Sequence, residues 1–220
     1  MDHLSTADAH LGRPDVQVPR SHYDWRIYND RRRWASYWHQ IDRVLALAPR
    51  DCLIIGEGDG TVTRSLRAAG VHLISVDHSP ELDPDVIGDV RALSLDDASF
   101  DVVLCAQVLE HIPFHDIGIA LGELARVSRR WVVISLPQRG RSWEFAFRLS
   151  PLPRVHLGGK LPARTRHRWD GQHHWELGAR DYPRRRVEAF FAQWFAIRRT
   201  FVVPDNPYHR FYVLERRSAS

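Results

Sequence analysis

The sequence predicts an α/β fold in which helices cover both faces of a doubly wound, mostly parallel sheet. Apolar runs of strand length alternate with helix-like segments along the 220 residues, and this alternation is typical of such sheets. A glycine-rich turn, Gly56–Gly60, directly follows the first apolar run, and Asp77 ends the second. Glycines between a strand and a helix let the backbone turn tightly and approach a ligand, so we expect a nucleotide-type cofactor site there.

The expected elements follow from apolar periodicity and turn residues. Strands are predicted near 52–56, 71–76, 86–88, 101–105, 131–136, 197–203 and 209–215, and helices near 31–47, 60–69, 115–128 and 184–195. Gly70 is expected to cap the second helix, and Pro183 precedes the last one. The segment between Asp77 and Asp85 is too short and proline-rich for a full helix. The turn at 204–207 predicts a hairpin, and hence an antiparallel last strand in a seven-stranded sheet.

Length and composition favour one globular domain. The chain is 44% hydrophobic and 26% charged, which is ordinary for a folded protein of this size. We expect a single domain over 21–220, preceded by a flexible polar arm at 1–20 that contains Pro14 and Pro19. The sequence has no apolar run of membrane-spanning length and no signal-peptide pattern, so a cytoplasmic protein without a membrane span is predicted.

The charge gives little support for a nucleic-acid partner. The net charge is +4, but Lys160 is the single lysine among 31 basic residues, so arginine usage reflects coding bias as much as function. The arginine runs at 31–33 and 184–186 lie beside helical patterns, where a solvated helix face is the expected explanation. Cys52 and Cys105 lie in apolar strands about three residues out of step, too far apart for a disulfide, and are expected to be buried thiols.

The spacing of the glycines narrows the type of cofactor. A dinucleotide fingerprint requires glycine where the chain has Thr61, and a P-loop requires Gly-Lys-Ser/Thr, which the turn lacks. The remaining pattern, G-x-G-x-G, resembles motif I of the class I S-adenosyl-L-methionine (SAM) methyltransferases. The segment "GDVRALSLDDASFDVVLCAQVLEHIPF", 88–114, is similar to the later motifs of that family, in particular of its methyltransferase type 11-like domains. The resemblance covers about 50–136 and implies a Rossmann-like fold whose antiparallel last strand lies beside the fifth.

The resemblance also implies the cofactor contacts. SAM, with S-adenosyl-L-homocysteine as product, is expected at the carboxyl ends of the strands, with the glycine turn facing its methionine part and ribose and Asp77 accepting the ribose hydroxyls. A helix-capping acid is the alternative for Asp77. The acid that the family usually has before the first glycine is Ile54 here, so Glu57 or Glu110 is expected to meet the cofactor's ammonium group, and a solvated loop position is the alternative for Glu57. The full predicted cofactor-binding set is Gly56, Glu57, Gly58, Gly60, Asp77, His78, Asp89, Val90, Ala106, Gln107 and Glu110.

Methyl transfer requires alignment of donor and acceptor, and a hydroxyl or protonated amine acceptor must also lose a proton. His111, in "LEH", is the first candidate base; the alternative is that it packs the site wall without titrating. His173 and His174 are further catalytic candidates, in the long segment 137–183. This segment is longer than an ordinary loop and is predicted to recognise the acceptor, with Arg139, Trp175, Glu176 and Tyr182 as substrate-binding residues.

No metal site is predicted. Neighbouring histidines in an extended segment point to opposite faces, so His173 and His174 are poorly placed to bind one ion, and no further ligand spacing supports a site. The sequence therefore predicts a SAM-dependent methyltransferase that acts on a hydroxyl or amine of a small-molecule or glycan-type acceptor. The alternatives are an RNA methyltransferase and a SAM-binding protein that does not methylate. A homodimer is a possible assembly, and nucleic acid is not the expected partner.

Overall fold

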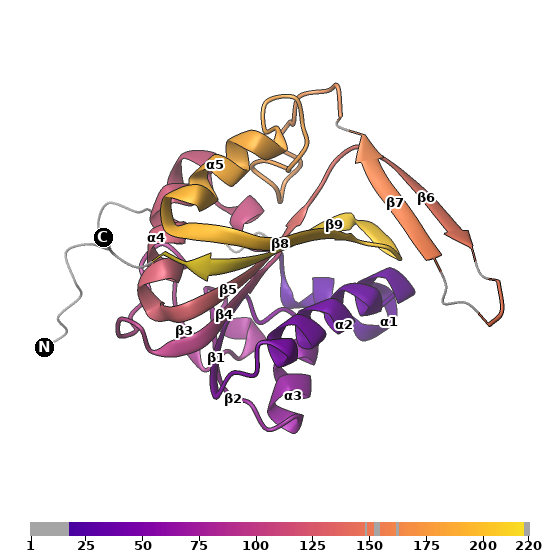
Figure 1. Cartoon of the computed structure of the whole chain (residues 1–220). Coiled ribbons are helices and arrows are strands. Elements are labelled where there is room, and N and C mark those ends of the chain that lie inside the picture. Colours follow the sequence, from indigo (N-terminus) through magenta and orange to yellow (C-terminus); the bar gives the residue numbers. More distant parts are fainter. Residues whose placement is uncertain (1–17, 148, 152–154, 162, 218–220) are drawn as a thin grey trace, which may run out of the picture.

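A computed structural model describes residues 18–147, 149–151, 155–161 and 163–217. Its main sheet has seven strands in the order β3-β2-β1-β4-β5-β9-β8 (Figure 1). The first five run parallel, and β9 is antiparallel to both of its neighbours. The strands are β1 (Asp51–Ile55), β2 (His72–Asp77), β3 (Val86–Ile87), β4 (Phe100–Ala106), β5 (Ser128–Pro137), β8 (Phe195–Val203) and β9 (Asn206–Arg216). This arrangement confirms the predicted Rossmann-like sheet with an antiparallel last strand.

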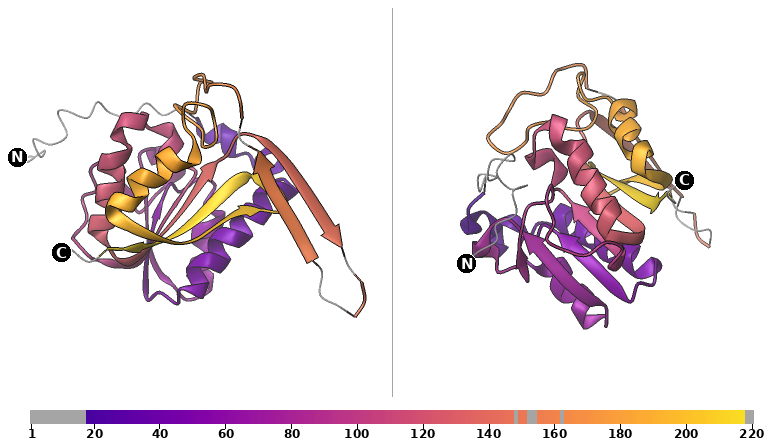
Figure 2. Two further views of the ribbon diagram at one scale, coloured as in Figure 1. Left: turned by 45° about the horizontal axis from the view of Figure 1, so that its top comes forward. Right: turned by 90° about the vertical axis from the view of Figure 1, so that its left-hand side faces the viewer.

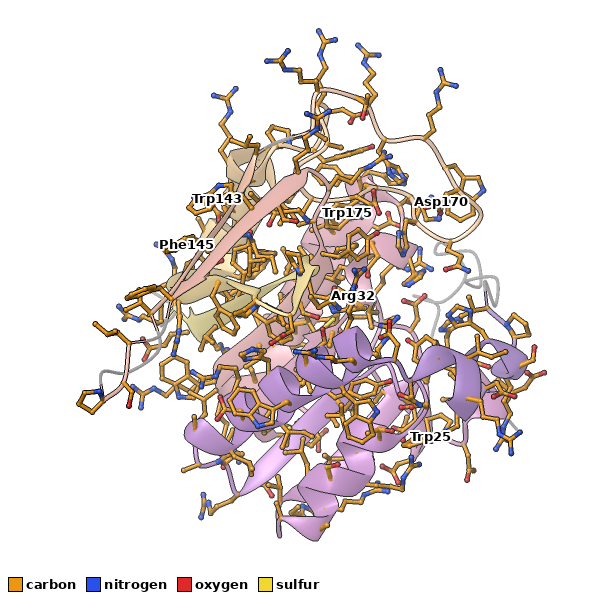
Figure 3. The ribbon with its side chains drawn as sticks, turned by 90° about the vertical axis from the view of Figure 1, so that its right-hand side faces the viewer. Trp25, Arg32, Trp143, Phe145, Asp170 and Trp175 are labelled. Carbon is orange, nitrogen blue, oxygen red and sulfur yellow. The ribbon has the colours of Figure 1, made fainter. Side chains whose placement is uncertain are left out.

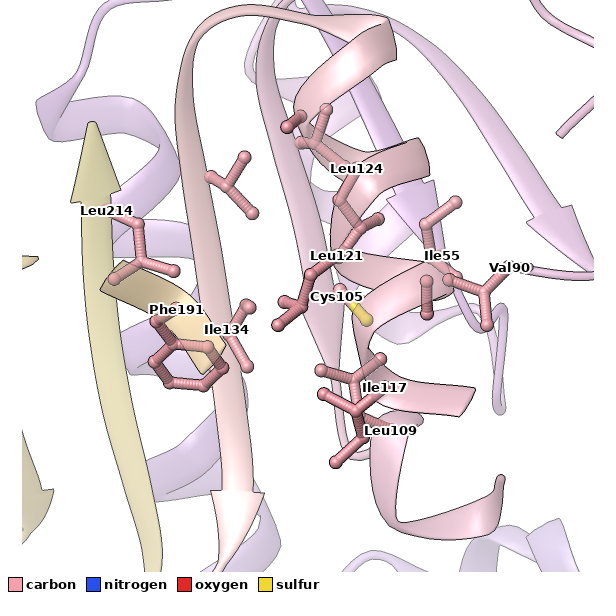
Figure 4. Close-up of a cluster of buried hydrophobic side chains, with 14 of the residues drawn as sticks. Ile55, Val90, Cys105, Leu109, Ile117, Leu121, Leu124, Ile134, Phe191 and Leu214 are labelled. Atoms are coloured by element: carbon pink, nitrogen blue, oxygen red, sulfur yellow. The ribbon is translucent and has the colours of Figure 1, made fainter. Parts of the chain in front are cut away.

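Helices cover both faces of the sheet, as the sequence predicts (Figure 2). On one face, α2 (Arg31–Ala46) and α3 (Thr61–Ala68) pack against Cys52, Ile54 and Leu104. On the other, α4 (Ile117–Val127) and α5 (Arg184–Trp194) pack against Leu53, Ile55 and other buried residues, part of which Figure 4 shows. Because successive side chains of a strand point to opposite faces, the continuous apolar run at 52–55 supplies both layers of the core.

Local signals set the helix ends. Asp30 caps α2 by accepting a hydrogen bond from the backbone N–H of Arg33 at 2.8 Å. Short helices that the sequence did not predict are η1 (Arg20–Tyr23), α1 (Trp25–Tyr28), η2 (Pro80–Leu82), η3 (Leu109–His111) and η4 (Phe114–Asp116). The last of these explains why α4 begins at residue 117 and not at 115. No helix among the described residues is long and apolar enough to cross a membrane.

The segment 137–183 has structure of its own. It contains an antiparallel hairpin of β6 (Arg141–Phe147) and β7 (Val155–Leu161) that projects from the body of the protein (Figure 1). The rest of the segment folds back over the sheet near α5 and brings residues 172–177 into contact with η3 and β5. Of the predicted N-terminal arm, residues 1–17 lie outside the described part of the chain. Cys52 and Cys105 are free and buried, as expected.

Candidate cofactor and acceptor site

A cavity lies where the carboxyl ends of β1, β2 and β4 meet, the position at which open α/β sheets bind ligands. Most of the residues that are predicted to contact the cofactor line this cavity. The predicted residues that line it are Gly56, Glu57, Gly58, Asp77, His78, Asp89, Val90, Ala106 and Gln107. Gly60 and Glu110 belong to the predicted set but not to this lining. The cavity is therefore built largely from the loops that follow four parallel strands, β1, β2, β3 and β4.

The glycine turn needs its glycines for backbone reasons. Gly56, Gly58 and Gly60 have φ of +87°, +58° and +72°, a region that other L-residues rarely adopt. A Cβ on Gly56 would also lie 2.6 Å from Cγ2 of Val108. Gly60 is the N-cap residue of α3 and not a wall of the cavity. Gly60 thus starts the helix behind the turn, and its contact with a ligand stays a prediction.

Asp77 is held at the end of β2 with its carboxylate beside the cavity. It is buried and accepts hydrogen bonds from the backbone N–H groups of Glu57 and Ser79, both at 2.9 Å, while Nδ1 of His78 lies 3.3 Å away. Burial opposes ionisation, but the hydrogen bonds from His78 and from the two amides outweigh it and hold the pKa of Asp77 below its ordinary value. Since a carboxylate offers about four acceptor positions, capacity remains for a ligand.

Asp89 lines the cavity and also takes part in an ion-pair network with Arg91. The guanidinium of Arg91 binds both its carboxylate oxygens, at 3.0 and 3.1 Å from Nε, and bridges to Asp116 at 2.7 Å. Arg91 is buried, so this network fixes the loop after β3 against the start of α4. Asp89 is therefore a positioned acid whose oxygens are already partly used.

Ile54 stands where the family usually has an acidic residue, and two acidic residues of the glycine turn line the cavity here. Glu57 lines the cavity, but Oε2 accepts a hydrogen bond from Thr63 at 2.9 Å, and burial raises its pKa. Asp59, which the sequence analysis did not select, also lines the cavity; it accepts hydrogen bonds from Asn29 and from the N–H of Thr61. Glu110 is fully buried behind the wall and is not part of the lining. The negative groups that face the cavity from the turn are thus Glu57 and Asp59.

The N-terminal elements form the remaining wall. Tyr23, Tyr28, Arg33, Tyr37 and Gln40 line the cavity from η1, α1 and α2. Tyr23 and Tyr28 contact each other edge to face, and the guanidinium of Arg33 lies 4.2 Å from the centre of the Tyr28 ring. The sequence shows the aromatic character of 23–28, but the helix face that carries Arg33 and Tyr37 becomes recognisable only when α2 packs across the sheet.

The three candidate catalytic histidines have different surroundings. His111 lines the cavity, and its Nδ1 lies 2.9 Å from the carbonyl oxygen of Gln172, so Nδ1 carries the proton that it donates. Burial, with the nearby His173, lowers the pKa of His111 to about 4. His173 lies behind it, with ring centres 5.1 Å apart. His174 instead packs on Trp169, at 4.4 Å between ring centres, away from the cavity.

Comparison with known proteins agrees with this geometry. Residues 53–134 match the family model described as "Methyltransferase domain", which covers β1 to most of β5. This stretch of the chain is therefore similar to a methyltransferase domain. The matched segment holds the glycine turn, Asp77, Asp89 and His111.

Relatives of the methyltransferase domain are distant. A ubiquinone biosynthesis O-methyltransferase of Hahella chejuensis is 29% identical over 104 residues, which is 40% of this chain and 43% of that protein. An uncharacterized methyltransferase of Mycobacterium tuberculosis is 33% identical over 99 residues, 40% of either chain. The chain therefore matches less than half the length of these relatives. A solved 1,6-didemethyltoxoflavin-N1-methyltransferase of Burkholderia thailandensis, with S-adenosylhomocysteine bound, has a TM-score of 0.60 at 17% identity and covers 90% of this chain and 87% of its own.

The residues predicted to bind the acceptor lie outside the matched region, and the structure places them in two different environments. Trp175 is fully buried in the main core, and its Nε1–H donates to the carbonyl oxygen of Leu109 at 3.0 Å (Figure 3). The prediction that Trp175 binds substrate is wrong for this structure, because no atom of its side chain is accessible to a ligand. Tyr182 packs beside Phe114 against the same core, at 4.7 Å between ring centres.

Arg139 and Glu176 lie together in a second, more open hollow. Nε of Arg139 is 3.0 Å from Oε2 of Glu176, and Glu176 also accepts a hydrogen bond from the hydroxyl of Tyr208. Burial opposes ionisation of Glu176, but its bonds to His173 and Tyr208 and the charge of Arg139 lower its pKa. The other residues that line this hollow are Arg164, Thr165, Arg166, His167, Arg168, Asp170 and Arg180. Its arginines give it a strongly positive character.

Proposed function

We propose that this protein is a SAM-dependent methyltransferase that methylates a hydroxyl or amine of a small-molecule or glycan-type acceptor. The observation that carries the proposal is the buried carboxylate of Asp77, which lies at the end of β2 beside the glycine turn. Three of its roughly four acceptor positions are used by His78 and the two amides, and the remaining one suits a ribose hydroxyl of SAM. When bound, SAM supplies a methyl group already activated by its sulfonium.

The surrounding residues suit the other parts of the cofactor. Val90 offers an apolar contact to the adenine, and Asp89 an acceptor for its amino group. Glu57 and Asp59 supply negative charge for the ammonium group, while Arg33 supplies positive charge for the carboxylate. Tyr23 and Tyr28 cover the cavity from the N-terminal side and limit the access of water. These residues thus position SAM, so that its methyl group can lie close to and in line with the acceptor atom.

The acceptor class is supported by the relatives. The Hahella protein is named an O-methyltransferase of ubiquinone biosynthesis, and the Burkholderia protein holds a small heterocyclic acceptor. The positive hollow beside Arg139 gives this chain a surface for an acidic or polar part of such a molecule. A cytoplasmic location and a homodimer stay predictions.

Methyl-labelled SAM, incubated with the protein and an extract of the source cells, tests this function. We expect label in a nuclease-resistant small-molecule or glycan fraction, and much less of it when Asp77→Ala replaces the wild-type protein at a low SAM concentration. Nuclease-sensitive label would contradict the proposed acceptor and indicate RNA. Absence of label with SAM binding intact would show a SAM-binding protein that does not methylate.

Arg33→Gln is expected to raise the Kd for S-adenosylhomocysteine about fivefold, because the variant loses a charge-assisted contact to the ligand carboxylate at a partly exposed site. Titration calorimetry at two salt concentrations measures the effect, which should shrink as salt rises. Arg32→Gln is the matched control, since Arg32 is exposed and does not line the cavity. An equal rise in the Kd for S-adenosylhomocysteine in both variants would show that the carboxylate of the ligand does not contact Arg33.

A further inference from the structure

We propose that Glu110, His111 and His173 bind one divalent transition-metal ion beside the cofactor cavity. Each residue offers one ligand atom, and these atoms all lie within 4.8 Å of one another. Glu110 and His111 belong to η3, directly after β4, whereas His173 comes from the segment that folds back over the sheet. The proposal departs from the sequence-based expectation of no metal, which considered His173 with His174 and not with η3.

The side chain of Glu110 supplies the strongest reason. It is 0% exposed, and neither carboxylate oxygen has a hydrogen-bond partner among the described residues. A buried carboxylate without a hydrogen-bond partner in the described chain is costly, because burial removes the water that would otherwise solvate its charge. Burial accordingly raises the pKa of Glu110 to about 7, and the nearby His173 offsets only part of this effect. A cation bound between Glu110 and the two imidazoles would remove the cost.

The histidines are oriented as metal ligands usually are. A ligating histidine typically donates its other ring N–H to a carbonyl or carboxylate, which fixes the tautomer. Nδ1 of His111 lies 2.9 Å from the carbonyl oxygen of Gln172, and Nδ1 of His173 lies 3.4 Å from Oε1 of Glu176. In these tautomers, Nε2 of each ring carries the lone pair that a metal requires.

The distances require a modest contraction. Ligand atoms about 2.1 Å from one ion lie roughly 3–3.5 Å from each other, compared with the limit of 4.8 Å found here. His173 lies on an irregular segment and the carboxylate of Glu110 has no hydrogen bonds to break, so small side-chain rotations can close this difference. Two imidazoles and one carboxylate favour Zn²⁺, Co²⁺ or a similar ion over Mg²⁺ or Ca²⁺, which prefer oxygen ligands.

A second group, Asp170, His173 and Glu176, competes for the same histidine. Its acids are already satisfied: Asp170 accepts hydrogen bonds from the N–H groups of Gln172 and His173, and Glu176 is bound by Arg139 and Tyr208. Asp170 also lies on the outer loop, with 49% of its side chain exposed (Figure 3). The unsatisfied carboxylate of Glu110 therefore favours the first group.

The location suggests what the ion does. His111 lines the cofactor cavity, so an open coordination position can face the bound acceptor. An acceptor hydroxyl at that position would have a lowered pKa and could pass its proton to a water molecule, without a strong protein base. This role, unlike ion binding itself, rests on the proposed methyltransferase function.

Cobalt uptake tests the site directly. The full-length protein is treated with a chelator, titrated with Co²⁺ and followed by visible absorption and calorimetry. We expect one Co²⁺ per chain, competition by Zn²⁺ and little effect of Mg²⁺. Glu110→Gln, which keeps the shape of the side chain, should raise the Kd for Co²⁺ more than about tenfold. Asp170→Asn, the matched control, should change it less than about threefold.

The outcomes are decisive in either direction. No stoichiometric uptake by the wild-type protein, or equal uptake by Glu110→Gln, would overturn the proposal. So would a larger loss in Asp170→Asn, which would assign the ion to the second group. The circular dichroism spectrum and the urea unfolding midpoint of Glu110→Gln, expected close to those of wild type, verify that this variant is folded. Failure of the proposed methyl transfer would leave Co²⁺ uptake unchanged, so the two proposals fail separately.

Discussion

Replacing Asp77 by alanine is expected to weaken SAM binding by about 1.5–3 kcal/mol, roughly 10- to 150-fold in Kd. The variant removes the acceptor for a ribose hydroxyl. It also leaves the backbone N–H groups of Glu57 and Ser79 without their present partner, which loosens the glycine turn. Titration calorimetry with SAM and with S-adenosylhomocysteine measures the loss.

Two further variants separate the ligand contact from the support of the loop. Asp77→Asn keeps one oxygen acceptor and removes the charge, so we expect a loss smaller than that of alanine. Asp101→Asn is the matched control, because Asp101 also accepts hydrogen bonds from two backbone N–H groups, of Arg50 and Asp51, but at the opposite edge of the sheet. If Asp77→Ala bound SAM with the same affinity as wild type, the proposal that SAM binds in this cavity would be contradicted.

The sheet was predictable because its signals are local. Apolar runs of five or six residues, separated by helices with recognisable ends, specify parallel strands that are buried on both faces. The turn Gly56–Gly60 and Asp77 mark the carboxyl edge of the first two strands. Most of the predicted cofactor residues therefore line the cavity, since the topology of an open α/β sheet fixes that edge as the site.

The remaining wall depends on packing that the sequence does not specify. Arg33 and Tyr37 lie on the face of α2 that lines the cavity. The sequence of α2 alone does not show which of its faces packs there. The hairpin β6–β7 did have a local signal, because Trp143, Phe145 and Phe147 alternate with polar or small residues. The high density of arginine and aromatic residues directed the interpretation toward recognition and away from a strand.

The contacts between η3 and residues 172–177 could not be predicted from the sequence either. Glu110 and His111 were recognised as part of a motif, and His173 as part of a separate cluster. Their proximity depends on the backbone of 172–177, which hydrogen-bonds to η3 and β5 through His174 N–H to Glu110 O and Leu177 N–H to Pro137 O. Contacts between residues about sixty positions apart are a property of the folded chain.

Trp175→Ala is expected to lower the free energy of unfolding by about 3–5 kcal/mol, the scale for removing a fully buried tryptophan. The side chain is 0% exposed, contacts Phe114 at 5.3 Å between ring centres, and donates a hydrogen bond to Leu109. The substitution leaves a cavity and an unpaired carbonyl directly before Glu110 and His111. Urea unfolding followed by circular dichroism measures the change.

Trp169→Ala supplies the control from the same segment. Trp169 is 54% exposed, so its removal should change stability by less than about 0.5 kcal/mol. Trp175→Phe keeps most of the apolar volume and loses the hydrogen bond to Leu109, so an intermediate loss is expected. If Trp175→Ala unfolded at the same urea concentration as wild type, the side chain would not belong to the core, and its predicted role in acceptor binding would return. If the losses follow the order Ala, Phe and then Trp169→Ala, the segment 172–177 is anchored by Trp175, and this anchor is what holds His173 beside η3.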